Sequence, residues 1–334
     1  MNLSKRNRNN TLYNRIENQI KIIQGEQIKA LQIHPRQCIE WVEESFKTKQ
    51  DVQLPTKNSV HPQAEDFFTS MPCLLPEAYG RFGIKIVHRI QGANPTLGSD
   101  ILLYDSRQGK LLAMIDGDWI TGMRTGAVAA LSVRLFKRNG NLPISIMGLG
   151  NTARATLLCL LADNPNQHLH VRLLAYNNQE TLFTERFKNE KNLSFEVIND
   201  PNIFFSEADV IISCITAAGG KLVCPNNKLF KEGVLVVPVH TRGFQNCDLF
   251  FDQVFGDDYN HIAGFKYFQQ FKHFEELGNV LTSKVSGRIN DKERILAYNV
   301  GIGLHDILFA SKIYDLVGDT STFVQRKESD KYWI

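Results

Sequence analysis

Residues 143–155 read Pro-Ile-Ser-Ile-Met-Gly-Leu-Gly-Asn-Thr-Ala-Arg-Ala. The stretch begins with a short apolar run typical of a strand. It then turns through Gly-x-Gly-x-x-Ala and continues into an apolar run of helical length, residues 155–162. In such a turn Gly148 permits the bend, Gly150 lets the backbone approach a pyrophosphate, and Ala153 lets the helix pack on the strand. The start of the helix offers free N–H groups and the positive end of a dipole to the phosphates. The context predicts dinucleotide binding, although a glycine spacing of this kind also occurs in plain turns.

Apolar runs that follow this turn indicate a parallel sheet. Four more predicted strands cover residues 170–176, 193–198, 209–216 and 234–240. Near-continuous Val, Ile and Leu suit strands that are buried on both faces, and the intervening segments are long enough for crossover helices. The predicted class is therefore α/β, with a Rossmann-type doubly wound parallel sheet. Thr216 and His240, each the last residue of a predicted strand, should face the crevice where ligands bind.

Length and charge exclude several classes of protein. The chain has 334 residues, enough for two domains, and its net charge of +3 gives no reason to expect a nucleic-acid partner. No apolar run approaches the length of a membrane span, so no membrane association is predicted. The basic, Asn-rich start, with Lys5, Arg6 and Arg8, is interpreted as a tail and not as a targeting signal, because no apolar segment follows it.

The cysteines and histidines predict neither disulfides nor a metal site. Six cysteines are scattered without a Cys-x-x-Cys pair, which fits small core residues in a reducing cytoplasm. His168 and His170 lie on one side of a predicted strand and could bind a metal. A solvated strand face explains them more simply, and no metal is predicted.

Before the glycine turn, the sequence predicts mixed α and β structure. Residues 1–50 have a helical apolar spacing, and residues 51–57 are extended. The expected elements after these are strands at 67–75 and 83–87, a β-hairpin formed by 101–105 and 110–116, and a helix at 119–136.

After the predicted parallel strands, residues 247–258 indicate a turn and a last strand. A helix is expected around 271–277. Residues 294–317 predict one long apolar helix, interrupted by Gly301 and Gly303, which could return the chain to its first domain.

Two cations stand out in apolar surroundings. Arg124 lies in a predicted helix rich in Gly, Ala and Ser, where a charge must either reach water or meet an anion. Both interpretations stay open on the residues alone. Lys85 interrupts the strand at 83–87, and without further information an ordinary exposed strand lysine is favoured.

Over about residues 50–318 the chain resembles the ornithine cyclodeaminase/μ-crystallin family. The resemblance rests on four ordered stretches: Met114-Ile-Asp-Gly-Asp-Trp-Ile-Thr-Gly-Met-Arg-Thr-Gly-Ala127, the glycine turn, Glu276-Leu-Gly-Asn-Val-Leu281 and Asn299-Val-Gly-Ile-Gly-Leu-His-Asp306. It implies a discontinuous α+β substrate-binding and dimerisation domain, residues 1–138 and 301–334. It also implies a Rossmann domain at 139–300, and a homodimer that pairs its first domains across shared β-structure.

The resemblance also implies a site. Lys85 corresponds to a catalytic and substrate-binding lysine, Arg124 to the arginine that binds the substrate carboxylate, and Lys57 to a further cation there. Three cations at one pocket suit a small carboxylate-bearing substrate. The implied cofactor contacts are Thr96, Thr125, Gly148, Gly150, Asn151, Thr152, Ala153, Asn177, Thr216, Val239, His240 and Asn299.

Two departures from the family pattern bear on the chemistry. Arg242 stands where the cyclodeaminases have an aspartate thought to transfer protons, and a fixed cation is no general base at neutral pH. His240 could replace that base, or could simply pack or cap; Arg242 could bind a second acidic group or a cofactor phosphate. Asn177 ends the second strand, where an acid would favour NAD and an arginine NADP, so the cofactor is left as NAD or NADP.

The resulting expectation is a cytoplasmic NAD(P)-dependent oxidoreductase that acts on the C–N bond of an amino acid or its imine. The lysine at 57 and the missing aspartate are similar to a siderophore-pathway branch of the family, which favours a biosynthetic role. One alternative is an ornithine- or lysine-type cyclodeaminase that releases ammonia and holds its NAD tightly. The other is a non-catalytic binding protein of the μ-crystallin kind.

Overall fold

The chain forms two compact units, each assembled from separated segments. A computed structural model describes residues 19–63, 65–215, 223–240, 244, 246–318 and 322–326. One unit contains Met1–Ile33, Val52–Ile120 and Asp306–Ile334, and the other contains His34–Asp51 and Thr121–His305. We call them the first and the second unit. The predicted domain boundaries stay a prediction, because compactness does not establish that a segment folds independently.

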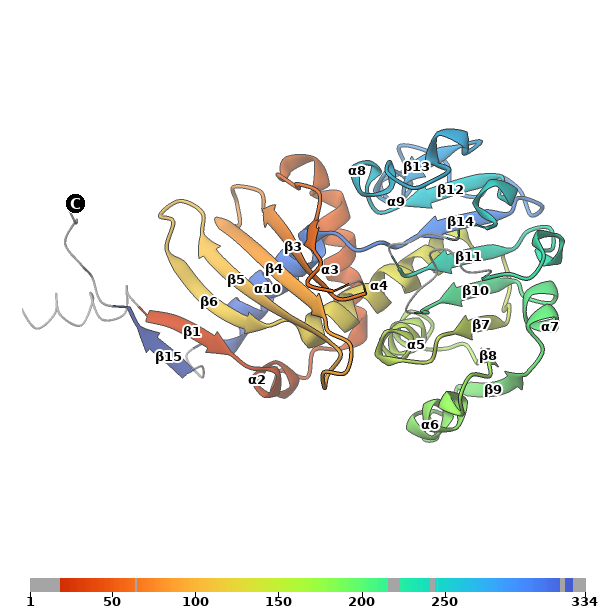
Figure 1. Ribbon diagram of the computed structural model, residues 1–334, viewed down its shortest axis with the longest axis horizontal. Helices are drawn as coiled ribbons and strands as arrows, with labels where there is room; N and C mark the ends of the chain where they lie inside the picture. The colour runs from red at the N-terminus through yellow and green to blue at the C-terminus, as the bar shows by residue number, and fades with distance from the viewer. Residues whose placement is uncertain are drawn as a thin grey trace, which may run out of the picture. The chain divides into compact units, whose positions relative to one another are not determined.

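The second unit is built on an eight-stranded sheet in which every pair of neighbouring strands is parallel (Figure 1). Its strand order is β13-β12-β14-β11-β10-β7-β8-β9. The strands are β7 (Ile144–Met147), β8 (Leu169–Leu174), β9 (Leu193–Ile198), β10 (Val210–Ser213), β11 (Leu235–Pro238), β12 (Gln253–Gly256), β13 (Phe274–Glu276) and β14 (Ile295–Tyr298).

This order is the doubly wound arrangement that the sequence predicts. The chain runs outward from β7 through β8 to β9, then returns to β10 on the other side of β7 and continues to β11. The order therefore reverses between β7 and β10, and ligands of such sheets bind outside the carboxyl ends of the strands at this point. Four central strands, β7, β10, β11 and β14, are buried at every residue, as their apolar runs require.

The second unit also contains helices. They are α3 (Pro35–Lys47), most of α4 (Asp118–Phe136), α5 (Asn151–Asp163), α6 (Gln179–Arg186), α7 (Pro201–Ser206), α8 (Tyr259–Ile262) and α9 (Leu277–Leu281), with 3-10 turns η1 (Lys49–Asp51), η2 (Asn227–Leu229), η3 (Asp248–Phe250) and η4 (Phe268–Gln270). At Gly126, α4 approaches the backbone of α5 so closely that an added Cβ would lie 2.4 Å from the carbonyl carbon of Ala155.

The first unit is built on a seven-stranded mixed sheet of order β15-β1-β6-β5-β4-β3-β2. The strands are β1 (Gln19–Ile23), β2 (Asn58–Val60), β3 (Phe67–Leu74), β4 (Arg81–Arg89), β5 (Leu97–Asp105), β6 (Leu111–Asp116) and β15 (Thr322–Gln325). The short helix α2 (Gly25–Ala30) follows β1. β1 pairs in parallel with β6, and the other neighbours pair antiparallel.

Helix α10 (Gly303–Val317) covers one face of this sheet (Figure 1). Gly83 and Lys85 of β4 point toward it, because an added Cβ on Gly83 would lie 2.7 Å from the side chain of Ile307. Successive residues of a strand face opposite sides, so Ile84 and Ile86 lie on the other face. Both are half-buried.

Three segments differ from the sequence prediction. Gln19–Ile23, expected to be helical, is strand β1; Phe274–Glu276, expected in a helix, is strand β13. Ile295–Tyr298, expected to begin the long C-terminal helix, is strand β14 in the middle of the parallel sheet. Consequently 253–256 is not the last strand. The α/β class with a Rossmann-type sheet and a second, mixed sheet is confirmed. The predicted basic tail lies outside the described residues.

Candidate functional site

The turn after β7 has the shape that its glycines predict. Gly148 has φ +79°, which L side chains rarely adopt. An added Cβ would also lie 2.6 Å from backbone atoms of Cys214 and Ile215, which follow β10. The amide of Cys214 donates to the carbonyl of Met147 at 2.8 Å, so the turn is closed against the neighbouring strand. Only glycine fits here.

The start of helix α5 is open. Gly150 is the N-cap residue, and no side chain in the described part of the chain caps this end. Gly150 is exposed, and an added Cβ there would meet nothing within 4 Å. Asn151 is exposed, Thr152 is half-buried, and Ala153 is fully buried. Free backbone N–H groups at such an end can hold an anion, so these residues fit a pyrophosphate.

The end of the second parallel strand is solvent-exposed. Asn177 and Asn178 have φ of +50° and +58°, values that asparagine tolerates better than most residues. The amide of Tyr176 donates to Glu180 at 3.2 Å. On α5, burial and the nearby Arg186 lower the pKa of Arg154. The strand end therefore carries asparagines with the carboxylate of Glu180 beside them, and each of the two flanking helices has an arginine.

His240 follows the end of β11, where Val239 donates its amide to the carbonyl of Ser213 at 2.9 Å. The Nε2 atom of His240 lies 3.2 Å from the Ser213 hydroxyl, and its ring stacks on Phe244 at 6.1 Å. Burial lowers the pKa of His240 to about 4, so the ring is neutral at pH 7. Its Nδ1 atom is buried and has no hydrogen-bond partner among the described residues. A neutral imidazole with one open nitrogen can accept a proton or donate a hydrogen bond. Thr216 and Arg242 lie outside the described residues.

Arg124 is held in α4 and is 6% exposed. Its guanidinium lies over Gly301, where an added Cβ would be 2.3 Å from Nη1. Gly301 has φ +75°, and its amide donates to the carboxylate of Asp257 at 2.7 Å. Of the two interpretations left open by the sequence, an arginine that reaches water is wrong, because this side chain is buried. A planar cation in such a place can bind a carboxylate in bidentate fashion.

Asn299, predicted to contact the cofactor, lies two residues before Gly301 and is 3% exposed. Its amide nitrogen donates to the hydroxyl of Ser132 at 3.0 Å and to Asp257 at 3.4 Å. These bonds fix the 299–301 segment to α4. The hydroxyl of Thr125, another predicted cofactor contact, donates to the carbonyl of Thr121 at 2.7 Å.

In the first unit, Lys85 forms a buried ion pair. Its Nζ lies 2.7 Å from Oδ1 of Asp306, and both side chains are 0% exposed. The exposed strand lysine favoured on residues alone is thus wrong. Since Lys85 is sealed in this structure, a substrate can contact it only after a local movement. Lys57 is half-buried before β2, and Thr96 is exposed, with its hydroxyl bonded to the carbonyl of Ala93 at 3.1 Å.

Asp257 and Asp306 were not predicted as site residues. Asp306 could have been found by the pattern that drew attention to Arg124. It is a charged residue in an apolar helical run, and it ends one of the stretches on which the family resemblance rests. Asp257 gave no signal, because adjacent acidic residues after a strand usually face solvent.

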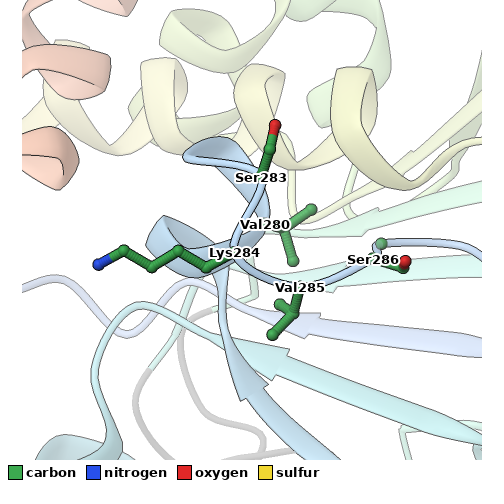
Figure 2. A pocket seen from close by; sticks show the side chains of 6 residues that line it. Val280, Ser283, Lys284, Val285 and Ser286 are labelled. Atoms are coloured by element: carbon green, nitrogen blue, oxygen red, sulfur yellow. The ribbon is translucent and has the colours of Figure 1, made fainter.

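A surface hollow of about 400 Å³ lies in the second unit, lined by Val280, Ser283, Lys284, Val285, Ser286 and Gly287 (Figure 2). The amine of Lys284 points away from the other labelled side chains. An added Cβ on Gly287 would lie 3.5 Å from the last turn of α4, which leads to the amino end of β7. The hollow includes none of the predicted site residues that the structure describes.

Within the described ranges, no cluster of three or more His, Cys, Asp or Glu side chains could hold a metal ion. His168 and His170 bond to Ser194, and His170 also lies 3.3 Å from Glu196. None of the helices described is both long and apolar enough to cross a membrane.

The sequence model of the ornithine cyclodeaminase/mu-crystallin family matches residues 19–321. The nodulation efficiency protein NfeD of Rhizobium meliloti is 24% identical over 274 residues, 78% of this chain and 83% of that protein. A Δ(1)-pyrroline-2-carboxylate reductase of Bacillus cereus is 24% identical over 264 residues, 72% of this chain and 78% of that protein.

Solved structures share the fold. The Δ(1)-pyrroline-2-carboxylate reductase of Thermococcus litoralis, solved with NADH and L-proline, has a TM-score of 0.80 and 18% identity, and the match covers 92% of this chain and all of that one. An archaeal alanine dehydrogenase dimer with bound NAD has a TM-score of 0.78 and 19% identity, covering 92% and 99% of the two chains.

Proposed function

Since the chain belongs to the ornithine cyclodeaminase/mu-crystallin family, we propose that it is an NAD(P)-dependent oxidoreductase acting on the C–N bond of an amino acid or its imine. The observation that carries the proposal is the turn at Gly148, which only glycine fits and which leads into the uncapped start of α5 at the switch point of a parallel sheet. The names of relatives support the imine chemistry, since they include Δ(1)-pyrroline-2-carboxylate reductases.

A bound dinucleotide would supply the hydride, and Gly148, Gly150, Asn151, Thr152 and Ala153 would hold its phosphates. Backbone N–H groups at the start of α5 neutralise the pyrophosphate charge without any side chain. Thr96, Thr125, Asn177, Thr216, Val239, His240 and Asn299 complete the proposed cofactor contacts.

Substrate binding is assigned to the cations. Arg124 grips the carboxylate, with Lys57, Lys85 and Arg242 as further cations of the site. Fixed charges orient the imine so that its carbon faces the hydride donor, and such orientation supplies much of the rate. The imine carbon gains the hydride and the nitrogen gains a proton, which gives the amine. In the reverse direction, in which the amine is oxidised, the neutral ring of His240 is assigned as the base that accepts this proton.

The test is a coupled measurement of nicotinamide oxidation and ammonia release. Purified protein is titrated with NADH and NADPH by fluorescence, which also decides between the two cofactors. It is then given a panel of cyclic imines, and of 2-oxo acids with amines. Loss of reduced-nicotinamide absorbance in step with amine formation supports the proposal. Ammonia from ornithine or lysine without net redox change identifies a cyclodeaminase. Cofactor binding without any turnover identifies a binding protein.

We also propose that two copies pair through the first unit. The sheet face opposite α10 exposes Phe68 by 40% and Met114 by 46%. Leu102 and Ile84 lie in register beside Met114, and His88 lies beside Phe68. Met114→Glu should convert a dimer to monomers in analytical ultracentrifugation, because a charge at the centre of an apolar interface is costly. Ile289→Glu is the matched control, since Ile289 is 67% exposed in the second unit. Unchanged sedimentation of Met114→Glu would remove this face from consideration.

The cytoplasm is the proposed compartment. All six cysteines are free, and burial raises the pKa of the thiols of Cys38 and Cys73 to about 12. Buried, neutral thiols without disulfides suit a reducing environment.

A further inference from the structure

The pair formed by Lys85 and Asp306 joins two segments that are 221 residues apart in the chain. Lys85 lies in the middle of β4, between β3 and β5, and Asp306 lies in the first turn of α10. Both side chains are 0% exposed, and the nitrogen-to-oxygen distance is 2.7 Å. The contact is therefore shielded from solvent and from salt.

A buried ammonium without a counter-charge loses its proton, because burial disfavours the charged form. A carboxylate at hydrogen-bond distance has the opposite effect and favours the charged form. At Lys85 the carboxylate of Asp306 provides this compensation. The charge state of Lys85 thus depends on a residue of another element.

On the two strands that flank β4, the residues paired with Lys85 carry no charge. The cross-strand partners of Lys85 are Met71 and Ile101, which are apolar. The titratable groups that face the pair include the thiol of Cys73, which points to the same side of the sheet. Burial, with the added charge of Asp306, raises the pKa of Cys73 to about 12, so the thiol stays neutral.

We propose that Asp306 is a positioning residue that keeps Lys85 as a fixed ammonium ion, so that Lys85 meets the substrate as a charged hydrogen-bond donor and not as a free amine. The assignment of Lys85 to the site rests on the proposed function. It follows that Lys85 forms no covalent imine with a carbonyl substrate and does not cycle its own proton. Its role is to orient the substrate, and proton exchange falls to another group.

The first test needs no catalytic activity. Asp306→Asn keeps the shape of the side chain and removes its charge; Lys85→Met/Asp306→Asn removes both charges. Urea unfolding of these variants and the wild type is compared at about pH 7 and about pH 10, on either side of the range in which a buried lysine titrates. In Asp306→Asn the folded form should hold Lys85 neutral, so that unfolding takes up a proton below the ordinary lysine pKa. Its folded-to-unfolded ratio, relative to the wild type, should rise at least about tenfold on going to the higher pH.

The double variant should lose this rise, because it has no lysine to titrate. A flat difference between Asp306→Asn and the wild type would overturn the inference. If Asp306→Asn does not fold at about pH 7, recovery of the fold at about pH 10 is expected. Failure to fold at both values would overturn it, whether or not the double variant folds.

The second test measures how the charge of Lys85 affects the pH dependence of turnover. The pH optimum for imine reduction should move by at least about one unit toward acid in Asp306→Asn, since Lys85 is then protonated only at lower pH. Asp306→Glu should restore the wild-type optimum. A lower rate with an unmoved optimum in Asp306→Asn contradicts the inference. If the wild type reduces no imine at all, the proposed function fails, and the unfolding comparison still decides the role of Asp306.

Discussion

The two units of this protein prepare for ligands in different ways. In the second unit, glycines determine the shape of the candidate site. Gly148 has φ +79°, Gly150 leaves the start of α5 without a capping side chain, and Gly301 leaves space for the guanidinium of Arg124. In the first unit the candidate site depends on a buried pair of opposite charges, Lys85 and Asp306. A site of the first kind can be predicted from the local spacing of glycines, whereas a site of the second kind forms only when distant segments of the chain meet.

The largest effect is expected from a substitution in the glycine turn of the second unit. Gly148→Ala should lower the free energy of unfolding by about 3 kcal/mol or more, because a left-handed backbone and a clash with Cys214 add together. NAD(P)H affinity should be lost with it. Chemical denaturation and fluorescence titration measure the two quantities.

Gly150→Ala is the matched control for that substitution. Gly150 has φ −85° and open space around it, so alanine, a poorer N-cap residue than glycine, should cost no more than about 1 kcal/mol. The new methyl group should nevertheless weaken NAD(P)H binding at least about tenfold, because it occupies the space of the phosphates. Equal affinity of Gly150→Ala and the wild type would break the assignment of a phosphate to this turn.

A second substitution tests whether the backbone of Gly301 positions the guanidinium of Arg124. Gly301→Ala should cost about 2 kcal/mol from its left-handed backbone and displace the guanidinium of Arg124. The KM for a carboxylate-bearing substrate should rise at least about tenfold, with cofactor affinity unchanged.

Gly318→Ala controls for the strain alone. Gly318 has φ +57° but no neighbour within 4 Å of an added Cβ, so its cost should be about 1 kcal/mol without any change in KM. If both variants leave KM unchanged, Gly301 does not position Arg124 for the substrate.

A pH-dependent effect, smaller than that of Gly148→Ala, is expected from His240, a side chain of the second unit. Burial lowers its pKa from 6.5 to about 4, so the unfolded chain binds a proton that the folded chain does not. Stability should therefore fall as the pH drops from about 6.5 toward about 4, by about 1–2 kcal/mol for this half-buried group.

Asp248 acts in the opposite sense over part of this window, because burial raises the pKa of its carboxyl to about 6 and favours the folded state at lower pH. The free energy of unfolding is therefore measured with urea for the wild type and for His240→Gln between about pH 4 and about pH 6.5. The difference between the two proteins is then followed as a function of pH. A difference that does not vary with pH would mean that His240 is charged in the folded protein.

Local patterns predicted much of the parallel sheet. Residues 193–198 form a strand with the predicted bounds, and the turn at 148–153 joins β7 to α5 as expected. These elements are specified by their own residues: continuous apolar runs and glycines at fixed spacing. The candidate contacts Gly148, Gly150 and Ala153 could be named from the sequence for the same reason.

Elements defined by partners far along the chain were missed. Ile295–Tyr298 is a four-residue apolar run beside an apolar helix, and periodicity cannot separate a short buried strand from helix. Gln19–Ile23 becomes a strand because β6 and β15 flank it, and β15 lies about 300 residues away. The neighbours of Lys85 and Arg124 could likewise not be predicted, since Asp306 and Gly301 reach them only in the folded chain.

The order of synthesis determines when Lys85 and Asp306 can pair. A ribosome releases β4 long before it reaches α10, and the whole of residues 121–305 emerges in between. Until Asp306 appears, Lys85 has no carboxylate from α10 to meet, and its strand cannot bury the ammonium without cost. The Rossmann sheet can therefore form first, while the first unit still lacks its last helix.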